Sequence, residues 1–317
     1  GTLLAGVLII GLAVVYLLQG DKSRIPLTIS NLYPDMTNIR NVVFAAGVIL
    51  GLAGMEMSAV HAQEVKNPQR DYPKAILLSV VVILSVSILG SLAIAIVVPG
   101  NQISLVAGLM QAFSSFLDQF NLRWMVPIIA FLVAAGTIGQ VSTWIVGPSK
   151  GLFATAQDGS LPTYFQNMNK NRMPTHMLIV QAIILTAISG VILLMPTVNS
   201  SYWILTALTS QLYLIMYILM FVSAIKLRYT RADTPRAYKI PGGRVGMWVV
   251  AGIGGLTSLA TIIIGFFPPS QLQTGNLFFY EAFLVLGITG MCLTPVVIHH
   301  FRKDSWKPSQ EEQNKAA

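Results

Sequence analysis

Charged residues are scarce in this sequence. Asp, Glu, Lys and Arg together make up 10% of the 317 residues, whereas hydrophobic residues make up 54%. A soluble domain is about one quarter charged. The composition therefore excludes an ordinary soluble protein and indicates an integral membrane protein.

The sequence also lacks the residues and motifs that several kinds of protein chemistry require. Cysteine occurs once, as Cys292, so no disulfide framework is possible. The sequence has no phosphate-binding loop, no paired intramembrane carboxylates, no Cys/His cluster, no arginine-rich helix and no potassium-filter motif. His299 and His300 end the last apolar run and are interpreted as interfacial residues. We therefore expect no catalytic residues, no metal and no cofactor, and no enzyme activity.

Long hydrophobic runs, in contrast, are plentiful. A helix that crosses a bilayer needs about 20 apolar residues. Such runs lie at 2–19, 41–63, 75–98, 124–147, 175–195, 202–227, 246–267 and 278–300. The runs are continuous rather than alternating, which excludes a strand-based barrel. The sequence predicts an all-α, polytopic membrane protein with about eight transmembrane helices, in one domain over 1–317 with a short tail at 301–317.

The positive charge is distributed unevenly. The net charge is +8, and sixteen of the twenty Lys and Arg residues lie in loops 64–74, 148–174 and 226–245 and in the tail. Basic loops face the cytoplasm. We therefore expect a cytoplasmic C-terminus in an inner (plasma) membrane, and no nucleic-acid partner. Between two spans, residues 101–122 are expected to form an amphipathic helix at the outer interface, with an ordinary loop as the alternative.

The most informative stretch is 41–74. Its apolar run contains the glycine-rich segment Gly51-Leu52-Ala53-Gly54-Met55, followed by the carboxylate of Glu56. Glycine inside a helix costs roughly 1 kcal/mol, and a charge at membrane depth costs about 2.5–3.5 kcal/mol on insertion scales. Together these features predict a broken transmembrane helix whose free backbone groups line a small-molecule site. Pro73 is expected in the first turn of the next helix.

Two further spans carry polar and aromatic residues at depth. Span 124–147 contains Gln140, Thr143 and Trp144, and Trp144 either occludes a ligand or packs between helices. In span 202–227, Tyr213 and Tyr217 are four residues apart and so share one helix face. Each hydroxyl needs a partner at that depth, which is either another protein group, a water molecule or a ligand. The segment after Trp144 is expected to continue as a helix to Asp158-Gly159.

These residues also match a known family. Gly54-Met55-Glu56 with 65–73 resembles the sixth helix of the amino acid–polyamine–organocation (APC) permeases. The run 143–152 resembles the eighth helix of the bacterial glutamate–GABA antiporters, and 238–243 extends the match. The resemblance implies a five-plus-five inverted-repeat (LeuT-like) fold with two additional helices. This chain would be a partial fold, helices five to twelve, with the N-terminal helices missing.

The resemblance also implies a substrate site. The unwound segment Gly51, Leu52, Ala53, Gly54, Met55 and Glu56 would hold the amino and carboxylate groups of the substrate. Trp144 would cap it, and Tyr213 would face it with Tyr217 one turn further on. Gln140 stands where the glutamate–GABA exchangers have an acidic residue, and a neutral amide cannot titrate.

We therefore expect a secondary active amino-acid transporter, an antiporter of the glutamate/GABA type that works by alternating access. Gln140, Thr143 and Tyr213 would recognise the substrate side chain. The expected partners are an amino acid or amine substrate and the lipid bilayer, and a homodimer is one possible assembly. Two alternatives stay open: a permease for another amino acid or amine, and an inactive fragment or scaffold subunit of a membrane complex.

Overall fold

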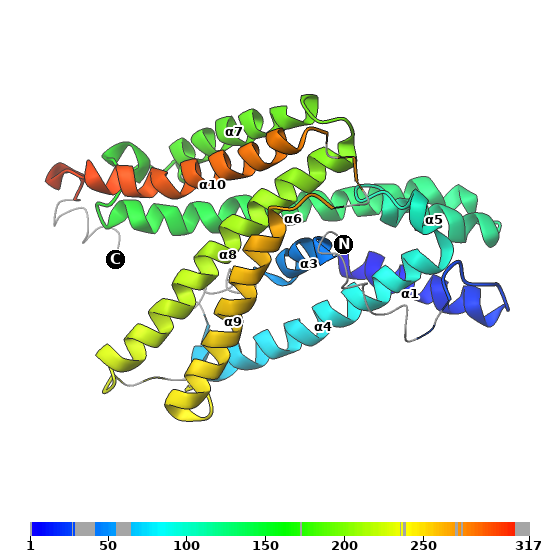
Figure 1. The fold of residues 1–317 in the computed structure, drawn as a ribbon, viewed down its shortest axis with the longest axis horizontal. Helices are drawn as coiled ribbons and strands as arrows, with labels where there is room; N and C mark the ends of the chain where they lie inside the picture. The colour runs from blue at the N-terminus through cyan, green and yellow to red at the C-terminus, as the bar shows by residue number, and fades with distance from the viewer. Residues whose placement is uncertain are drawn as a thin grey trace.

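The computed structural model describes residues 2–26, 28, 42–54, 65–171, 173–234, 236, 239–269, 272–273 and 275–307. Within these ranges the regular structure is entirely helical, as predicted (Figure 1). The helices are α1 (Thr2–Leu18), α3 (Phe44–Leu52), α4 (Pro68–Val97), α5 (Gly108–Gln119), α6 (Val126–Gln157), α7 (Thr175–Ser189), α8 (Val198–Thr230), α9 (Gly243–Gly265) and α10 (Leu277–His300).

Six helical stretches of the described residues are long and apolar enough to cross a membrane. They are Gln69–Val97, Arg123–Gln157, Thr175–Leu193, Val198–Thr230, Gly243–Gly265 and Leu277–His300. These correspond to six of the eight predicted spans. The predicted span 2–19 is a helix of 17 residues, α1. Of the predicted span 41–63, residue 41 and residues 55–64 lie outside the described residues.

The helices pack in two groups (Figure 1). In one group α1 lies along α4, and α5 packs against both; in the other, α8 runs antiparallel to α9 and also contacts α10 and α3. Each group has its own buried core. The first core contains Tyr16, Phe113 and Phe116, and the second contains Trp203 and Tyr280. The half-helix α3 is thus carried by the α8 group.

Residues 101–122 contain the predicted helix, but much of its apolar face is turned inward. α5 buries Phe113 and Phe116, and the rings of Phe116 and Tyr16 meet edge to face at 5.5 Å between centroids. Hence the side chains that suggested an interfacial position cover α1 and α4.

The start of α4 differs from the prediction. The helix begins at Pro68, so Pro73 lies inside it rather than in its first turn. Pro68 suits the first helical position because its missing N–H would be unpaired there in any case. Asp71 lies in the first turn, where the helix dipole favours a negative charge. Residues 68–74 of the predicted loop 64–74 are therefore helical.

The continuation of α6 was predicted correctly. The helix passes through Pro148 and ends at Gln157, and Gly159 follows in a left-handed conformation with φ +72°.

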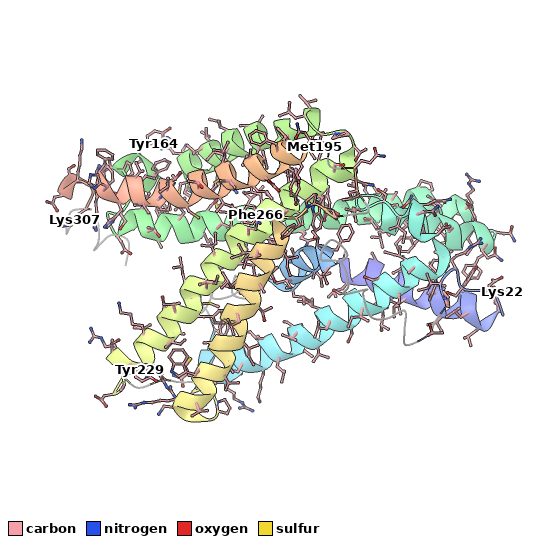
Figure 2. All side chains as sticks on the ribbon, viewed as in Figure 1. Lys22, Tyr164, Met195, Tyr229, Phe266 and Lys307 are labelled. Carbon is pink, nitrogen blue, oxygen red and sulfur yellow. The ribbon has the colours of Figure 1, made fainter. Side chains whose placement is uncertain are left out.

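Tyr229 lies near the end of α8, beside the start of α9 (Figure 2). Trp248 donates a hydrogen bond to the Tyr229 hydroxyl at 2.9 Å, and the Arg244 guanidinium lies 5.2 Å from the Tyr229 ring centroid. These contacts tie α9 to the end of α8.

Candidate functional site

The chain leaves the helix at the predicted glycine-rich segment. α3 has nine residues and ends at Leu52, after which Ala53 is extended (φ −78°, ψ 163°) and Gly54 has φ +103°. Nine helical residues rise about 13 Å, less than half of a bilayer core. α3 by itself is therefore too short to cross a bilayer.

The predicted unwound segment is thus only partly in place. Gly51 and Leu52 still belong to the last helical turn, and the described part of the break is Ala53 and Gly54. Met55 and Glu56 lie outside the described residues.

Two aromatic side chains from different helices meet at Gly54. Its amide donates a hydrogen bond to the hydroxyl of Tyr217, with 3.2 Å between the nitrogen and the oxygen. A Cβ on Gly54 would lie 2.9 Å from Cη2 of Trp144, closer than real Cβ contacts. Positive φ and this close approach both require glycine here. Trp144 from α6 and Tyr217 from α8 therefore hold the first residues of the break.

Tyr213 completes an aromatic row beside the break. The rings of Trp144 and Tyr213 meet edge to face at 6.2 Å, and those of Tyr213 and Tyr217 at 5.6 Å. The two tyrosines share a helix face, as their spacing predicted. Trp144 is 41% exposed, so part of its ring is open to a ligand. The row offers ring faces and hydroxyl groups within reach of a backbone amide.

The other two predicted residues lie on α6 beside this row. Gln140 is one helical turn before Trp144, and both Gln140 and Thr143 are exposed. The Thr143 hydroxyl donates to the Gly139 carbonyl of its own helix at 3.3 Å. The structure brings together Gly54, Trp144, Tyr213 and Tyr217, and it leaves Gln140 and Thr143 at the open edge.

The start of α3 is fixed to α8 by separate contacts. Phe44 meets Trp203 edge to face at 4.8 Å, and a Cβ on Gly47 would lie 3.3 Å from the same indole ring. Trp203 donates to the Tyr280 hydroxyl at 3.2 Å, and that hydroxyl donates to the Gly265 carbonyl at 3.2 Å. This buried chain links α3, α8, α9 and α10.

Sequence reasoning gave no role to Gln211, which is fully buried behind the tyrosines. Its Nε2 donates to the Ile262 carbonyl at 3.2 Å, and its Oε1 has no hydrogen-bond partner among the described residues. An amide side chain at a membrane-buried position two residues before Tyr213 was the available signal. Gln211 therefore links α8 to α9.

A groove elsewhere on the protein does not suit a charged solute. A groove of about 550 Å³ between α7, α8 and α10 is lined by Leu208, Phe279, Phe283, Gly287 and other apolar residues, and by Thr294. An amino acid needs partners for two charged groups, and this groove does not supply them. The described residues also contain no group of three or more His, Cys, Asp or Glu side chains that could hold a metal ion.

Comparison with known proteins gives a consistent result. An uncharacterized transporter of Legionella pneumophila is 46% identical over 91% of this chain and 62% of its own length. A glutamate/gamma-aminobutyrate antiporter of Lactococcus lactis is 33% identical over 98% of this chain and 63% of its own length. A probable agmatine/putrescine antiporter of the same species is 26% identical over 68% of this chain. The chain spans less than two thirds of the length of each relative.

The family described as "Amino acid permease" matches residues 2–289, nearly the whole chain. The six apolar helices of the described residues agree with this match. This multi-pass membrane protein belongs to the amino acid permeases of the APC superfamily.

Proposed function

We propose that this protein is a secondary active amino-acid antiporter of the glutamate/GABA type that works by alternating access. The observation that carries the proposal is the meeting of Gly54, Trp144, Tyr213 and Tyr217 at the end of α3. The likeness to the glutamate/gamma-aminobutyrate antiporter of L. lactis supports the substrate class. The family is one of transporters, and 1–317 forms a single transmembrane domain in this proposal.

The proposed mechanism follows from backbone groups that a broken helix cannot pair. Amides at the break donate to the substrate carboxylate, and carbonyls at the end of α3 accept from its ammonium group. Trp144 covers the bound solute, while Gln140, Thr143 and Tyr213 contact its side chain. Glu56 adjusts the local charge. Because Gln140 is neutral at all physiological pH values, proton coupling in this protein does not pass through that position.

The membrane arrangement is part of the proposal. In this proposal the protein lies in the inner membrane with its C-terminus in the cytoplasm, an orientation that the basic loops support. An amino acid or amine is the soluble partner, the lipid bilayer is the solvent, and a homodimer is the assembly to test.

Exchange in proteoliposomes tests the function. The protein, expressed with whatever its gene encodes before Gly1, is reconstituted with internal GABA, and uptake of labelled glutamate is measured. Trp144→Ala and Glu56→Gln are expected to lower uptake at least tenfold, whereas Trp124→Ala, an exposed tryptophan outside the site, should retain it. Undiminished uptake in both site variants would remove the site assignment. Uptake of another amino acid or amine instead would replace the substrate class.

A second candidate function rests on how much of its relatives' length this chain covers. The chain matches 62% or 63% of the length of two relatives, so a polypeptide of these residues alone would act as an inactive fragment or a scaffold subunit. Reading the DNA before Gly1 for four further hydrophobic spans distinguishes the two candidates.

A further inference from the structure

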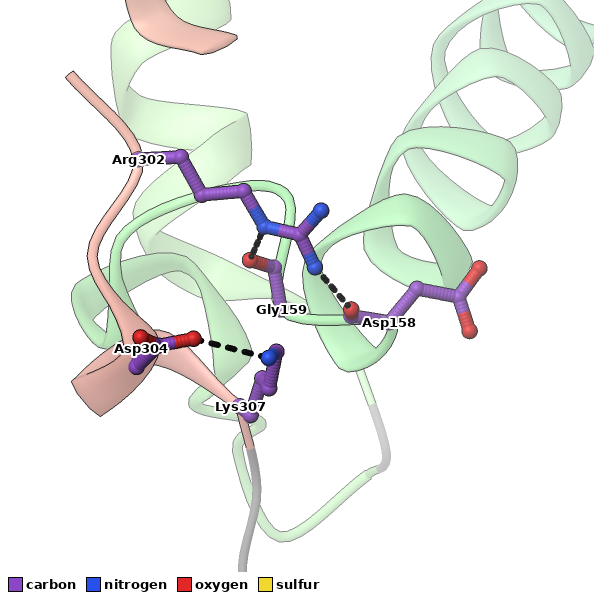
Figure 3. A network of polar contacts seen from close by, with 5 residues as sticks. All are labelled: Asp158, Gly159, Arg302, Asp304 and Lys307. Carbon is purple, nitrogen blue, oxygen red and sulfur yellow. Dashed lines mark hydrogen bonds and ion pairs between the residues drawn. The ribbon is translucent and has the colours of Figure 1, made fainter. Parts of the chain in front are cut away.

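The end of α6 is held by side chains from two other parts of the chain. A helix leaves its last carbonyls without intrahelical partners. Arg302, which follows α10, donates from Nε to the Gly159 carbonyl at 2.9 Å and from Nη2 to the Asp158 carbonyl at 3.2 Å (Figure 3). A guanidinium group suits this position because it offers several donors in a fixed geometry and its charge complements the helix dipole.

A second fastening lies beside the first. The Nε2 group of Gln166 contacts two carbonyls, that of Ala156 in α6 at 2.9 Å and that of Trp306 at 2.7 Å. A Cβ on Gly159 would lie 2.8 Å from the Cα of Lys307, so the segment passes directly over the glycine. Residues 302–307, here named the tail strap, are therefore fitted to the end of α6.

Apolar packing and one ion pair support the strap. Ile298, near the end of α10, packs against a small core that contains Ala156, Leu161 and Met177. Within the strap, Lys307 Nζ and Asp304 Oδ1 are 2.7 Å apart. The Asp158 carboxylate points away from Lys307 and Asp304 (Figure 3). Arg302 binds the backbone carbonyls of Asp158 and Gly159 rather than an acidic side chain.

The strap joins α6, which contacts α1, α5 and α7, to the group that contains α8 and α10. α10 packs against α8, where the Tyr280 hydroxyl accepts from Trp203. α6 carries Trp144, whereas α8 carries the two tyrosines of the candidate site. In the aromatic row, the rings of Trp144 and Tyr213 meet edge to face at 6.2 Å. The strap adds a separate connection, through hydrogen bonds, between the helix of Trp144 and the α8–α10 pair.

We propose that the tail strap is a conformational latch and that Arg302 is a positioning residue for Trp144. With the strap attached, the end of α6 is held against α10, and the indole keeps its place at Gly54. Release of Arg302 frees α6 to move relative to α8. The inference rests on the proposed function, because alternating access requires such a movement, but the test below does not need transport activity.

Electron spin resonance distances between α6 and α8 test the latch. Spin labels are attached at Lys150→Cys and Lys226→Cys in a Cys292→Ser background, since both lysines are exposed. The parent protein is expected to give one dominant distance. Arg302→Ala should at least double the fraction of molecules at other distances. Arg302→Lys, which keeps the charge but loses the paired geometry, should give a smaller change in the same direction.

Three controls make the outcome decisive. Lys303→Ala changes the neighbouring exposed charge and should leave the distances unchanged. Gln166→Ala removes the second attachment and should change the distances as Arg302→Ala does. If Arg302→Ala does not fold, Gln166→Ala and Arg302→Lys together test the latch. Parental distances in Arg302→Lys and Gln166→Ala, or an equal change in Lys303→Ala, would overturn the latch. Absent exchange activity in the parent would overturn the proposed function alone.

Discussion

The hydroxyl of Tyr217 accepts a hydrogen bond from the amide of Gly54. The two residues are 163 positions apart, and the bond joins the end of the half-helix α3 to the middle of α8. At membrane depth an amide without a partner costs about 1–3 kcal/mol. In the proposed mechanism, Tyr217 therefore takes the place that the substrate carboxylate would take.

Removing that hydroxyl should make the empty protein less stable and binding tighter. In Tyr217→Phe the Gly54 amide loses this acceptor, so we expect a lower thermal midpoint without substrate and a larger upward shift on adding glutamate. Thermal unfolding in detergent with and without glutamate measures both. Tyr202→Phe, an exposed tyrosine of the same helix, is the control and should match the parent. An unchanged glutamate shift in Tyr217→Phe would contradict the carboxylate assignment.

Gly54→Ala should be strongly destabilising for two separate reasons. A positive φ costs a non-glycine residue of order 1–3 kcal/mol, and the new Cβ would lie 2.9 Å from the Trp144 ring. Adding Trp144→Ala should restore only the part that comes from the clash. Gly90→Ala provides the comparison, because nothing lies within 4 Å of a Cβ there. Equal midpoints for Gly54→Ala and Gly90→Ala would show that the break is not as described.

Substitutions of Gln211 should separate packing from hydrogen bonding. Gln211→Met keeps most of the volume, loses the bond to the Ile262 carbonyl and removes the unpaired oxygen. These effects oppose each other, so stability should stay within about 1 kcal/mol of the parent. Gln211→Glu places a charge in the same buried position and should cost about 3 kcal/mol or more. Urea or thermal unfolding checks both variants; a stable Gln211→Glu protein would mean that this position is hydrated.

The ion pair in the tail strap predicts a dependence on acid. The hydrogen bond and charge of Lys307, with a smaller contribution from Arg302, lower the pKa of Asp304 below its ordinary value of 3.8. A carboxyl whose pKa is lower in the folded state stabilises that state above its unfolded pKa, and the contribution is lost as pH falls through the folded pKa. The contribution of this ion pair to the order of the strap should therefore be lost only below about pH 4.

A spin label at Ser305→Cys in the Cys292→Ser background reports this loosening through its mobility. The label in the parent should be less mobile at pH 6 than near pH 3, whereas Asp304→Asn should show no such difference between the two values. Equal mobility of the parent at both pH values would contradict this role of the ion pair.

The sequence predicted the features that depend on local chemistry. Glycine and positive φ belong together, so the interruption at Gly54 was foreseeable, and Asp158-Gly159 likewise marked the end of α6. The start of α4 was misplaced because either Pro68 or Pro73 fits a first turn, and only packing decides between them.

Contacts between distant segments were beyond sequence reasoning. Nothing in the pattern around Arg302 indicates that it binds the carbonyls of Asp158 and Gly159, because the partner groups are backbone atoms common to every residue. The same holds for Gln211 and the Ile262 carbonyl. The spacing of Tyr213 and Tyr217 showed their shared face, but not that one of them reaches Gly54.

The double attachment of α3 to α8 has a mechanical consequence. Phe44 in its first turn meets Trp203, and Gly54, just after its end, binds Tyr217. If the proposed function holds, α3 and α8 should move as one unit, with Gly47 kept against Trp203 and Thr206, and relative motion should occur where Trp144 of α6 meets Gly54.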